Sequence, residues 1–555
     1  MIFLMNKKLA FTLLLSIACI NNFACTNYLI GKAATVDGST MISYAADSYF
    51  SYGYLYYSPA ATYPSHTWMD IYEWDSGKYL GKIKQAEKTY AVVGNMNEYQ
   101  VSIGETTFGG RMELMDTTAT LDYGSLIYLA LQRSKTAREA IQAMTELVAE
   151  YGYRSEGESF SIGDPNEIWI LEMIGKGPKN KGAVWVARRI PNDCVSAHAN
   201  QSRITTFPLH DKNNCLYSPD VISFAREKGY FKGKDEDFSF ADCYAPLDYL
   251  ALRICEARVW TFFRKVNPEM DAYISYIKGE SSKRLPLWVK PTYKLSAQDV
   301  KNFMRDQYEG TELDITKGLG AGPFNSKLRC SPLTFMVDSV EYVHERPVAT
   351  QQTAFSFVAQ MRNWLPNYVG GILWFGVDDA ASSLYVPMYC GIYQIPDCYD
   401  IHNGSLLEYS PTSAFWIYNQ VANFAYSKYS YMMKDIKEVQ STWENKFNEL
   451  VPNVDKIAAN LPETTARDFL TDFSCLQATS STQAWKKLGE YLLVKYMDGN
   501  VKMEKDGKFL QNEKAIPPDI IRPGYPEDFL RQMVKENPQL RVKTIKELKE
   551  NNVIP

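Results

Sequence analysis

One cysteine near the amino terminus, Cys25, is well placed to do chemistry. If the chain is cut between Ala24 and Cys25, a thiol and a free α-amino group belong to the same residue. An unperturbed α-amine has a pKa of about 7.7–8.0 and a thiol one of about 8.5, so the amine can accept the thiol proton near neutral pH. An amino-terminal residue that supplies both nucleophile and base can hydrolyse amides. The predicted chemistry is attack of sulfur on a carbonyl carbon, giving a thioester that water releases.

The segment before Cys25 has the order of a secretory signal. Lys7 and Lys8 precede the apolar run LAFTLLLSIACI, and NNFA follows it. The run is about a dozen residues, short of the ~20 that a membrane-spanning helix needs. A small residue, Ala24, precedes the expected cut, although Asn22, two positions before Ala24, is atypical of a signal-peptide cleavage site. We therefore predict a signal peptide over residues 1–24 and export to the periplasm or the extracellular space, with no later membrane span.

Cys25 could instead carry a lipid, join a disulfide or be inert. A cysteine that carries a lipid usually has an aliphatic residue three positions before it, where Cys25 has Asn22. Cys19, in LSIAC, fits that pattern better. A surface lipoprotein that binds ligands without catalysis therefore stays an alternative. An oxidising compartment permits disulfides, whose pairing the sequence leaves open. The pairs nearest in sequence are Cys194 with Cys215 and Cys390 with Cys398.

Other catalytic patterns are absent from the sequence or weak. It has no GxSxG elbow, HExxH zinc pair or P-loop, so we predict no metal and no cofactor. His198 and Asn200 would share a strand face, which makes a cysteine–histidine–asparagine site conceivable. No cysteine, however, has the papain-type surroundings. A net charge of −5 without a basic stripe argues against nucleic acid as a partner, and the oligomeric state stays open.

Short β-prone runs dominate the region after residue 25. TNYLIGK and TMISYAA predict a hairpin that turns at Asp37-Gly38. YAVVGNMNEYQVSIGETTF, residues 90–108, predicts a second strand pair that turns at Asn95 to Glu98. Further strands are predicted in SFSIGDPNEIWILEMIG, GAVWVARRI, TAFSFVAQM, GGILWFGV and SSLYVPMY.

Helical periodicity is clearest in TAREAIQAMTELVAEYG. Thr136 and Glu139 predict a capping box at its start, and Gly152 predicts its end. From about residue 412 to 497 the pattern is nearly all helical. The order of strands, helices and strands indicates an α+β fold in which helices cover a mainly antiparallel sheet.

At this point the sequence resembles a known family. CTNYLIGKAATVDGSTMISYAADS is similar to the opening of the dipeptidase A-type cysteine peptidases, N-terminal nucleophile (Ntn) hydrolases related to penicillin V acylase and bile salt hydrolase. The motifs GNMNEYQVSIGETT, FSIGDPNEIWILEMIGKG, VSAHANQSRI and SSLYVPMYCGI follow in the same order, over roughly residues 25–400. The resemblance implies a four-layer αββα sandwich and amide hydrolysis on short peptides.

The resemblance also implies roles for individual residues. Cys25 matches the nucleophile, and Asp47 matches the acidic residue that contacts its amine; a solvent-facing hairpin end is the structural alternative. Asn200 matches the amide donor of the oxyanion hole, where a turn-forming asparagine is the alternative. Thr106 and Thr107 of GETT lie where relatives place a second oxyanion contact. The family motif has no equivalent asparagine there, which favours a backbone donor.

The resemblance suggests substrate or oxyanion roles for two further residues, which match the family pattern less closely. Arg258 aligns loosely with an active-site arginine of the acylases, a solvated or salt-bridged arginine being the alternative. Tyr44 stands where relatives carry an arginine, and tyrosine cannot replace its permanent charge. We interpret Asp164 and Glu172 as structural polar groups rather than catalysts.

The sequence thus predicts an exported cysteine dipeptidase that hydrolyses short peptides. The nearest alternative is an acylase of the penicillin V acylase or bile salt hydrolase type. We divide the chain into the signal, a catalytic domain over residues 25–405 and a helical region over residues 406–555, whose role stays open.

Overall fold

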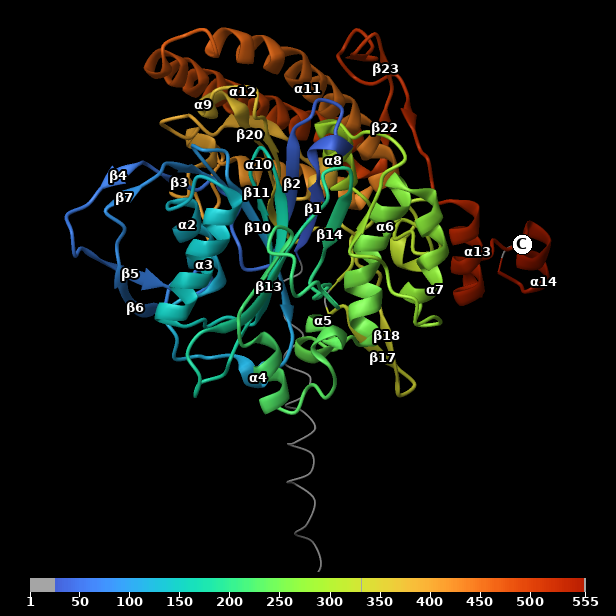
Figure 1. Cartoon of the computed structure of the whole chain (residues 1–555). Helices are drawn as coiled ribbons and strands as arrows, with labels where there is room; N and C mark the ends of the chain where they lie inside the picture. Colours follow the sequence, from blue (N-terminus) through green and yellow to red (C-terminus); the bar gives the residue numbers. More distant parts are fainter. Residues whose placement is uncertain (1–24, 331, 554–555) are drawn as a thin grey trace, which may run out of the picture.

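The computed structural model describes residues 25–330 and 332–553, so the predicted signal peptide lies outside the described residues. The fold combines antiparallel sheets with helices and ends in a helical region, which confirms the predicted α+β class (Figure 1). Two large sheets form its centre.

The first sheet contains the strand that begins directly after Cys25. Within it β1 and β2 form the predicted hairpin, with Thr26 opposite Ala45. Gly38 in the connecting turn has a φ of 83°, a left-handed conformation that glycine adopts readily. β2 also pairs with β19, which sets Asp47 opposite Thr353. The strands run in the order β16 (Trp288–Val289), β14 (Val195–His198), β1 (Thr26–Ile30), β2 (Thr40–Asp47), β19 (Thr353–Met361), β20 (Gly371–Val377) and β21 (Val386–Tyr389).

The second sheet contains the GETT motif. Residues 90–108 form three strands rather than the predicted pair, because the chain turns twice: once at Gly94, with a φ of 55°, and once around Asn97. Asn97 Oδ1 accepts hydrogen bonds from the backbone N–H groups of Tyr99 (2.9 Å) and Val101 (3.0 Å), which holds the second turn. The strands run in the order β15 (Cys215–Tyr217), β13 (Ala183–Arg189), β12 (Ile168–Gly175), β11 (Gly157–Gly163), β10 (Ser102–Gly109), β9 (Met96–Asn97), β8 (Val92–Val93) and β3 (Tyr57–Ser58).

The two sheets pack face to face, with β1 and β2 against β10, β11 and β12. His198 of β14 lies between them, 2.7 Å from Thr106 Oγ1 through Nδ1 and 2.7 Å from Ser161 Oγ through Nε2. This packing brings the start of β1 next to β10.

Two helices pack against the second sheet. The predicted helix is present: Thr136 accepts a hydrogen bond from the Glu139 N–H at its start, and Gly152, with a φ of 83°, follows its end. The Glu139 carboxylate accepts from the Lys135 N–H at 2.7 Å rather than from that of Thr136, so only one half of the capping box forms. The helices are α2 (Tyr123–Leu131) and α3 (Ala137–Tyr151).

Helices also cover the first sheet. α10, α11 and α12 pack against β20 and β21, while α6 packs against β14 and α8 against β19. The predicted helical stretch over residues 412–497 is confirmed, and it shares one hydrophobic core with the sheet. The division near residue 405 stays a prediction. The bounds are α6 (Ala257–Val266), α8 (Ala297–Phe303), α10 (Ala414–Ser427), α11 (Tyr429–Ala458) and α12 (Glu463–Tyr496).

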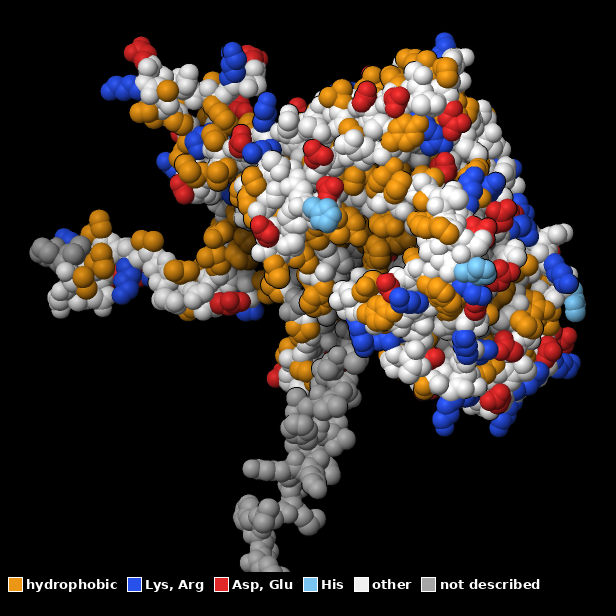
Figure 2. All heavy atoms as spheres, turned by 90° about the vertical axis from the view of Figure 1, so that its left-hand side faces the viewer, with side chains coloured by type: hydrophobic (Ala, Val, Ile, Leu, Met, Phe, Trp, Pro, Cys, Tyr) orange, Lys and Arg blue, Asp and Glu red, His pale blue; other side chains and the backbone are white. Residues whose placement is uncertain are grey.

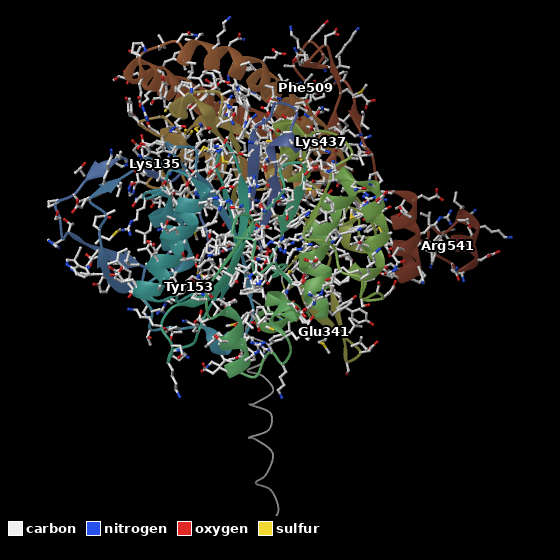
Figure 3. The ribbon with its side chains drawn as sticks, viewed as in Figure 1. Lys135, Tyr153, Glu341, Lys437, Phe509 and Arg541 are labelled. Atoms are coloured by element: carbon white, nitrogen blue, oxygen red, sulfur yellow. The ribbon has the colours of Figure 1, made fainter. Side chains whose placement is uncertain are left out.

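Smaller elements surround this centre. The last two helices, α13 (Glu527–Glu536) and α14 (Ile545–Glu550), project from the body of the molecule, and Arg541 in Figure 3 marks the segment between them. Among the described residues no helix has the length and apolar character needed to cross a membrane. The remaining helices and longer hairpins are α4 (Val221–Glu227), α5 (Phe240–Tyr244), α7 (Ile274–Ile277), α9 (Asn367–Gly370), β5 (Trp68–Tyr72) with β6 (Tyr79–Lys84), and β17 (Thr334–Val337) with β18 (Val340–Val343).

Charged side chains are mixed over the surface. On the face in Figure 2, basic and acidic groups lie among apolar ones, and neither sign gathers into an extended patch. The cysteines of the described residues are all free thiols, including the pairs whose disulfides the sequence left open.

Candidate active site

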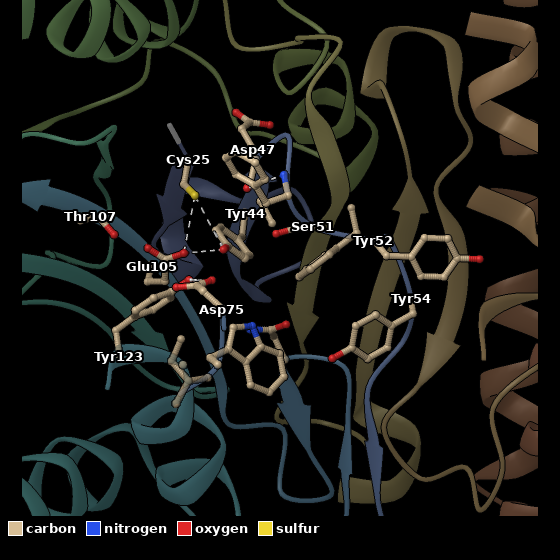
Figure 4. A pocket seen from close by; sticks show the side chains of 18 of the residues that line it. Cys25, Tyr44, Asp47, Ser51, Tyr52, Tyr54, Asp75, Glu105, Thr107 and Tyr123 are labelled. Carbon is tan, nitrogen blue, oxygen red and sulfur yellow. Dashed lines mark hydrogen bonds between the residues drawn. The ribbon is translucent and has the colours of Figure 1, made fainter. Parts of the chain in front are cut away.

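Cys25 lies in a cavity of about 270 Å³ at the edge where the two sheets meet (Figure 4). Aromatic side chains from several segments form a large part of its wall, and three carboxylates line it: Asp47, Asp75 and Glu105. The aromatic residues of the wall include Tyr44, Tyr52, Tyr54, Trp74, Tyr123 and Phe355. The cavity is thus small, aromatic and acidic.

The thiol of Cys25 is buried, with the residue only 4% exposed. Its sulfur lies 3.5 Å from Glu105 Oε1 and 3.8 Å from the hydroxyl oxygen of Tyr44. The Tyr44 hydroxyl also donates a short hydrogen bond to Glu105 Oε1. Sulfur, phenol and carboxylate therefore form one group, drawn with dashed lines in Figure 4.

This environment keeps the Cys25 thiol protonated. Burial raises the pKa of the thiol well above its usual value, and the negative charges of Glu105 and Asp47 raise it further. Hydrogen bonds with the Asp47 backbone and with Tyr44 oppose the shift without overcoming it. A nucleophilic role for this sulfur would therefore require a base that takes its proton.

Asp47 ends β2 beside Cys25 and is completely buried, so it is not a solvent-facing hairpin end. Its carboxylate accepts hydrogen bonds from Thr353 Oγ1 at 2.6 Å and from Arg346 Nη2 at 3.0 Å. Burial raises the pKa of Asp47, while the charge of Arg346 and the bond from Thr353 lower it. The ion pair fixes the carboxylate at the cavity wall.

Arg258 joins the two predicted catalytic residues Cys25 and Asn200. It is fully buried on α6, directly after a π-helical turn, and is not a solvated arginine. Its Nη1 donates to the Cys25 carbonyl oxygen at 2.6 Å and to Thr26 Oγ1 at 2.9 Å. Its Nη2 donates to Asn200 Oδ1 at 3.0 Å. One guanidinium thus sets the positions of the nucleophile's backbone and of the Asn200 amide.

The Asn200 amide is oriented by both of its ends. Asn200 follows β14 with a φ of 60°, and its Nδ2 donates to the Thr107 carbonyl oxygen at 2.7 Å. Oδ1 is held by Arg258, and the second hydrogen of Nδ2 has no acceptor among the described residues. Asn200 lines a neighbouring cavity with Thr107, and Thr107 lines both that cavity and the one at Cys25.

The two threonines of GETT point in opposite directions, because neighbouring residues of a strand alternate between its faces. The Thr106 side chain bonds to His198 between the sheets and does not line the cavity at Cys25. Thr107 does line it, and its hydroxyl donates to Glu158 Oε2 at 3.0 Å.

His198 does not complete a cysteine–histidine–asparagine site. Burial, together with the charge of Arg203, lowers the pKa of His198 to about 3, so the ring is neutral. Both ring nitrogens are engaged by Thr106 and Ser161, and the ring does not line the cavity at Cys25. The role of His198 is structural.

Asp164 and Glu172 are structural, as predicted. Asp164 accepts hydrogen bonds from backbone N–H groups in its own turn and at the start of α3. Glu172 accepts from Ser202 Oγ and from the Arg203 N–H. Neither lines the cavity at Cys25.

Sequence reasoning missed three carboxyl groups and one arginine. Glu105 belongs to the GETT motif, and the alternation of side chains along a strand places it on the same face as Thr107. Asp75, Glu158 and Arg346 carry no motif, and Arg346 reaches Asp47 from 299 positions away. Among the described residues no cluster of histidine, cysteine or acidic side chains is arranged to hold a metal ion.

Comparisons with known proteins found a matching family model and several relatives. The model of peptidase family C69 matches residues 24–442. A protein of Salmonella dublin named a probable dipeptidase is 25% identical over 409 residues, covering 70% of this chain and 86% of its own length. One of the same name from Latilactobacillus sakei is 25% identical, covering 76% and 85%. A probable dipeptidase B of Lactococcus lactis is 24% identical, covering 78% and 88%.

Proposed function

The chain belongs to peptidase family C69 and is a cysteine-type peptidase, and we propose that it is an exported dipeptidase whose nucleophile is the thiol of Cys25. The observation that carries the proposal is the position of Cys25. Its sulfur lies in a small cavity, and its own carbonyl is held by Arg258 at 2.6 Å. The names of the relatives point to dipeptides as substrates.

Activation of the thiol requires removal of residues 1–24. Cleavage after Ala24 would give Cys25 an α-amine within reach of its own sulfur, and that amine accepts the proton that the buried thiol keeps. The fixed carboxylate of Asp47 stabilises the resulting ammonium and orients it. The thiolate attacks the carbonyl carbon of the peptide bond. The carboxy-terminal residue leaves as an amine, and the remaining acyl group forms a thioester with Cys25. Water then releases the acyl group.

The oxyanion formed in each step needs hydrogen-bond donors. Asn200 supplies one from its amide, whose orientation Arg258 and the Thr107 carbonyl determine. Arg258 touches no reacting atom in this scheme, so it is a positioning residue.

The arrangement of layers supports the same assignment. Helices lie against the outer face of each sheet, and the sheets lie against each other. We propose that this is the four-layer αββα sandwich of Ntn hydrolases, with the nucleophile at the start of a central strand.

A small cavity favours short substrates. Pockets for drug-sized ligands usually have volumes of about 300–1,000 Å³, and the cavity at Cys25 has about 270 Å³. Two small residues joined by one peptide bond suit this volume better than a steroid conjugate does.

The test combines the mature terminus with substrate choice. The secreted, active protein is analysed by intact mass and amino-terminal sequencing, and a panel of dipeptides is compared with N-acyl amino acids. We expect a chain that begins at Cys25 and turns over dipeptides. An active chain that begins upstream of Cys25 contradicts the mechanism, and exclusive turnover of N-acyl amino acids contradicts the substrate class.

A further inference from the structure

The cavity at Cys25 carries negative charge that the described residues do not balance. Asp47, Asp75 and Glu105 line the cavity, whereas no lysine, arginine or histidine of the described residues does. Asp47 is paired with Arg346 outside the cavity at 3.0 Å. Glu105 has no ion pair with any described residue. A positively charged ligand group would provide the missing partner.

Glu105 is nevertheless deeply buried, with 2% of the residue exposed. Oε1 receives the Tyr44 hydroxyl and lies 3.5 Å from the Cys25 sulfur. Oε2 receives no N–H or hydroxyl hydrogen from the described residues. A buried carboxylate without a cation is strongly unfavourable, because hydrogen bonds from neutral groups do not replace both its water and a counter-charge. Such a group in a ligand cavity points to a cationic ligand.

The neighbouring carboxyl, Glu158, differs from Glu105 in its pKa and in its position. Glu158 is buried beside Glu105 and accepts the Thr107 hydroxyl at 3.0 Å. Burial and the charge of Glu105 raise the pKa of Glu158 well above its usual value. Burial also raises the pKa of Glu105, but hydrogen bonds from Glu158 and Tyr44 oppose that shift. The pKa of Glu158 is thus raised further than that of Glu105, and of the two only Glu105 lines the cavity.

The position of Glu105 fits one group of a peptide substrate in particular. A reacting carbonyl carbon lies about 3–3.5 Å from its nucleophile, and standard bond lengths place the α-nitrogen of the same residue about 2.5 Å from that carbon. A carboxylate oxygen 3.5 Å from the Cys25 sulfur is thus within hydrogen-bond reach of that α-nitrogen.

We propose that Glu105 binds the free α-ammonium group of the substrate's amino-terminal residue, the residue whose carbonyl Cys25 attacks. The inference rests on the proposed function and deepens it. Asp75, held by the Tyr123 hydroxyl at 3.0 Å, lies on the same wall and adds negative potential (Figure 4). Substrates whose amino group is acylated or absent leave the charge of Glu105 unpaired, so the site selects against them.

The experiment measures a selectivity ratio, because any change beside Cys25 can lower the absolute rate. The substrates are alanyl-alanine and propionyl-alanine, which differ by the α-amino group alone. Glu105→Gln removes the charge and keeps the shape. Glu158→Gln is the matched control, since it replaces a neighbouring buried carboxyl that does not line the cavity. Binding is measured separately, as the protection of Cys25 from alkylation by iodoacetamide in the presence of each compound.

We expect the mature wild-type enzyme to prefer alanyl-alanine by about 10²-fold or more in kcat/KM, as loss of one partner of a buried charge pair predicts. The preference should fall to within a few-fold in Glu105→Gln and persist in Glu158→Gln. An unchanged preference in Glu105→Gln, or an equal loss in both variants, overturns the assignment. If the wild type turns over no dipeptide of the panel, the proposed function fails. In that case the alkylation assay still tests the ammonium site. Stronger protection of Cys25 by alanyl-alanine than by propionyl-alanine, lost only in Glu105→Gln, would support the site. Equal protection by both compounds would overturn it.

Discussion

Replacing Arg258 by lysine tests whether one buried guanidinium holds the catalytic geometry. Arg258 reaches the Cys25 carbonyl with Nη1 and Asn200 Oδ1 with Nη2, at 2.6 and 3.0 Å. Lysine keeps the charge but offers a single nitrogen instead of a planar fork, so it cannot hold both acceptors in the same way. Either Cys25 or Asn200 then loses the hydrogen bond that Arg258 donates to it.

The structure gives the size of the effect. A hydrogen bond to a charged group contributes about 1.5–3 kcal/mol, and each 1.36 kcal/mol of transition-state stabilisation changes the rate tenfold. Loss of one such bond should lower kcat by about 10–10²-fold. KM should change little, because Arg258 does not line the cavity at Cys25. The assay is steady-state hydrolysis of a dipeptide by the mature protein, with the thermal midpoint measured alongside.

Arg203 provides the control. It is also buried, pairs with Glu256 at 2.9 Å and donates to the Ala197 carbonyl, but it does not line the cavity at Cys25. Arg203→Lys should lower the thermal midpoint and leave kcat nearly unchanged. Equal kcat losses in the two variants would mean that Arg258 acts through general stability, and wild-type kcat in Arg258→Lys would refute the positioning role.

Three further predictions follow from individual side chains. Cys25→Ala should abolish turnover while the thermal midpoint stays within a few degrees of that of the wild type, and residual dipeptide hydrolysis would point to another nucleophile. Asn200→Ala should lower kcat by about 10²–10³-fold if its amide holds the oxyanion; near-wild-type kinetics would remove it from the site. Burial lowers the pKa of Lys301 to about 7, with Nζ 3.4 Å from the centre of the Trp374 ring. Between pH 7 and 10 the unfolded chain therefore binds one proton more than the folded chain. Stability should rise with pH there by up to about 1.4 kcal/mol per unit from this group, and Lys301→Met should flatten that slope in denaturant titrations.

Local sequence signals predicted the hairpin that carries Cys25 and Asp47. Asp37 and Gly38 lie in the connection between the two strands, and the register of the pair sets the end of β2 beside the start of β1. The same kind of signal predicted α3, whose apolar face repeats with the helical period. These elements depend on contacts close in sequence.

The electrostatics of the cavity could not be predicted in the same way. Arg346 pairs with Asp47, and Arg258 contacts Cys25, across 299 and 233 positions of the chain. Their segments showed no motif that specifies this proximity. Glu105 was visible in GETT, but its burial without a cation depends on which side chains several distant loops bring to the cavity wall.

The carboxylates at Cys25 have opposite effects before and after cleavage. While the nitrogen of Cys25 is part of a peptide bond, the negative charges of Glu105 and Asp47 raise the pKa of the thiol and keep it from attacking. Once the proposed cut frees the amine, the charge of Asp47 stabilises an ammonium group on that residue, so the amine becomes a stronger proton acceptor. In the proposed mechanism the acidic cavity therefore makes the unprocessed chain a poor nucleophile and the mature chain a competent one. If this reasoning is correct, alkylation of Cys25 by iodoacetamide at neutral pH should be slow in the full-length chain and faster in the chain that begins at Cys25. Equal rates would show that the carboxylates do not link processing to activity.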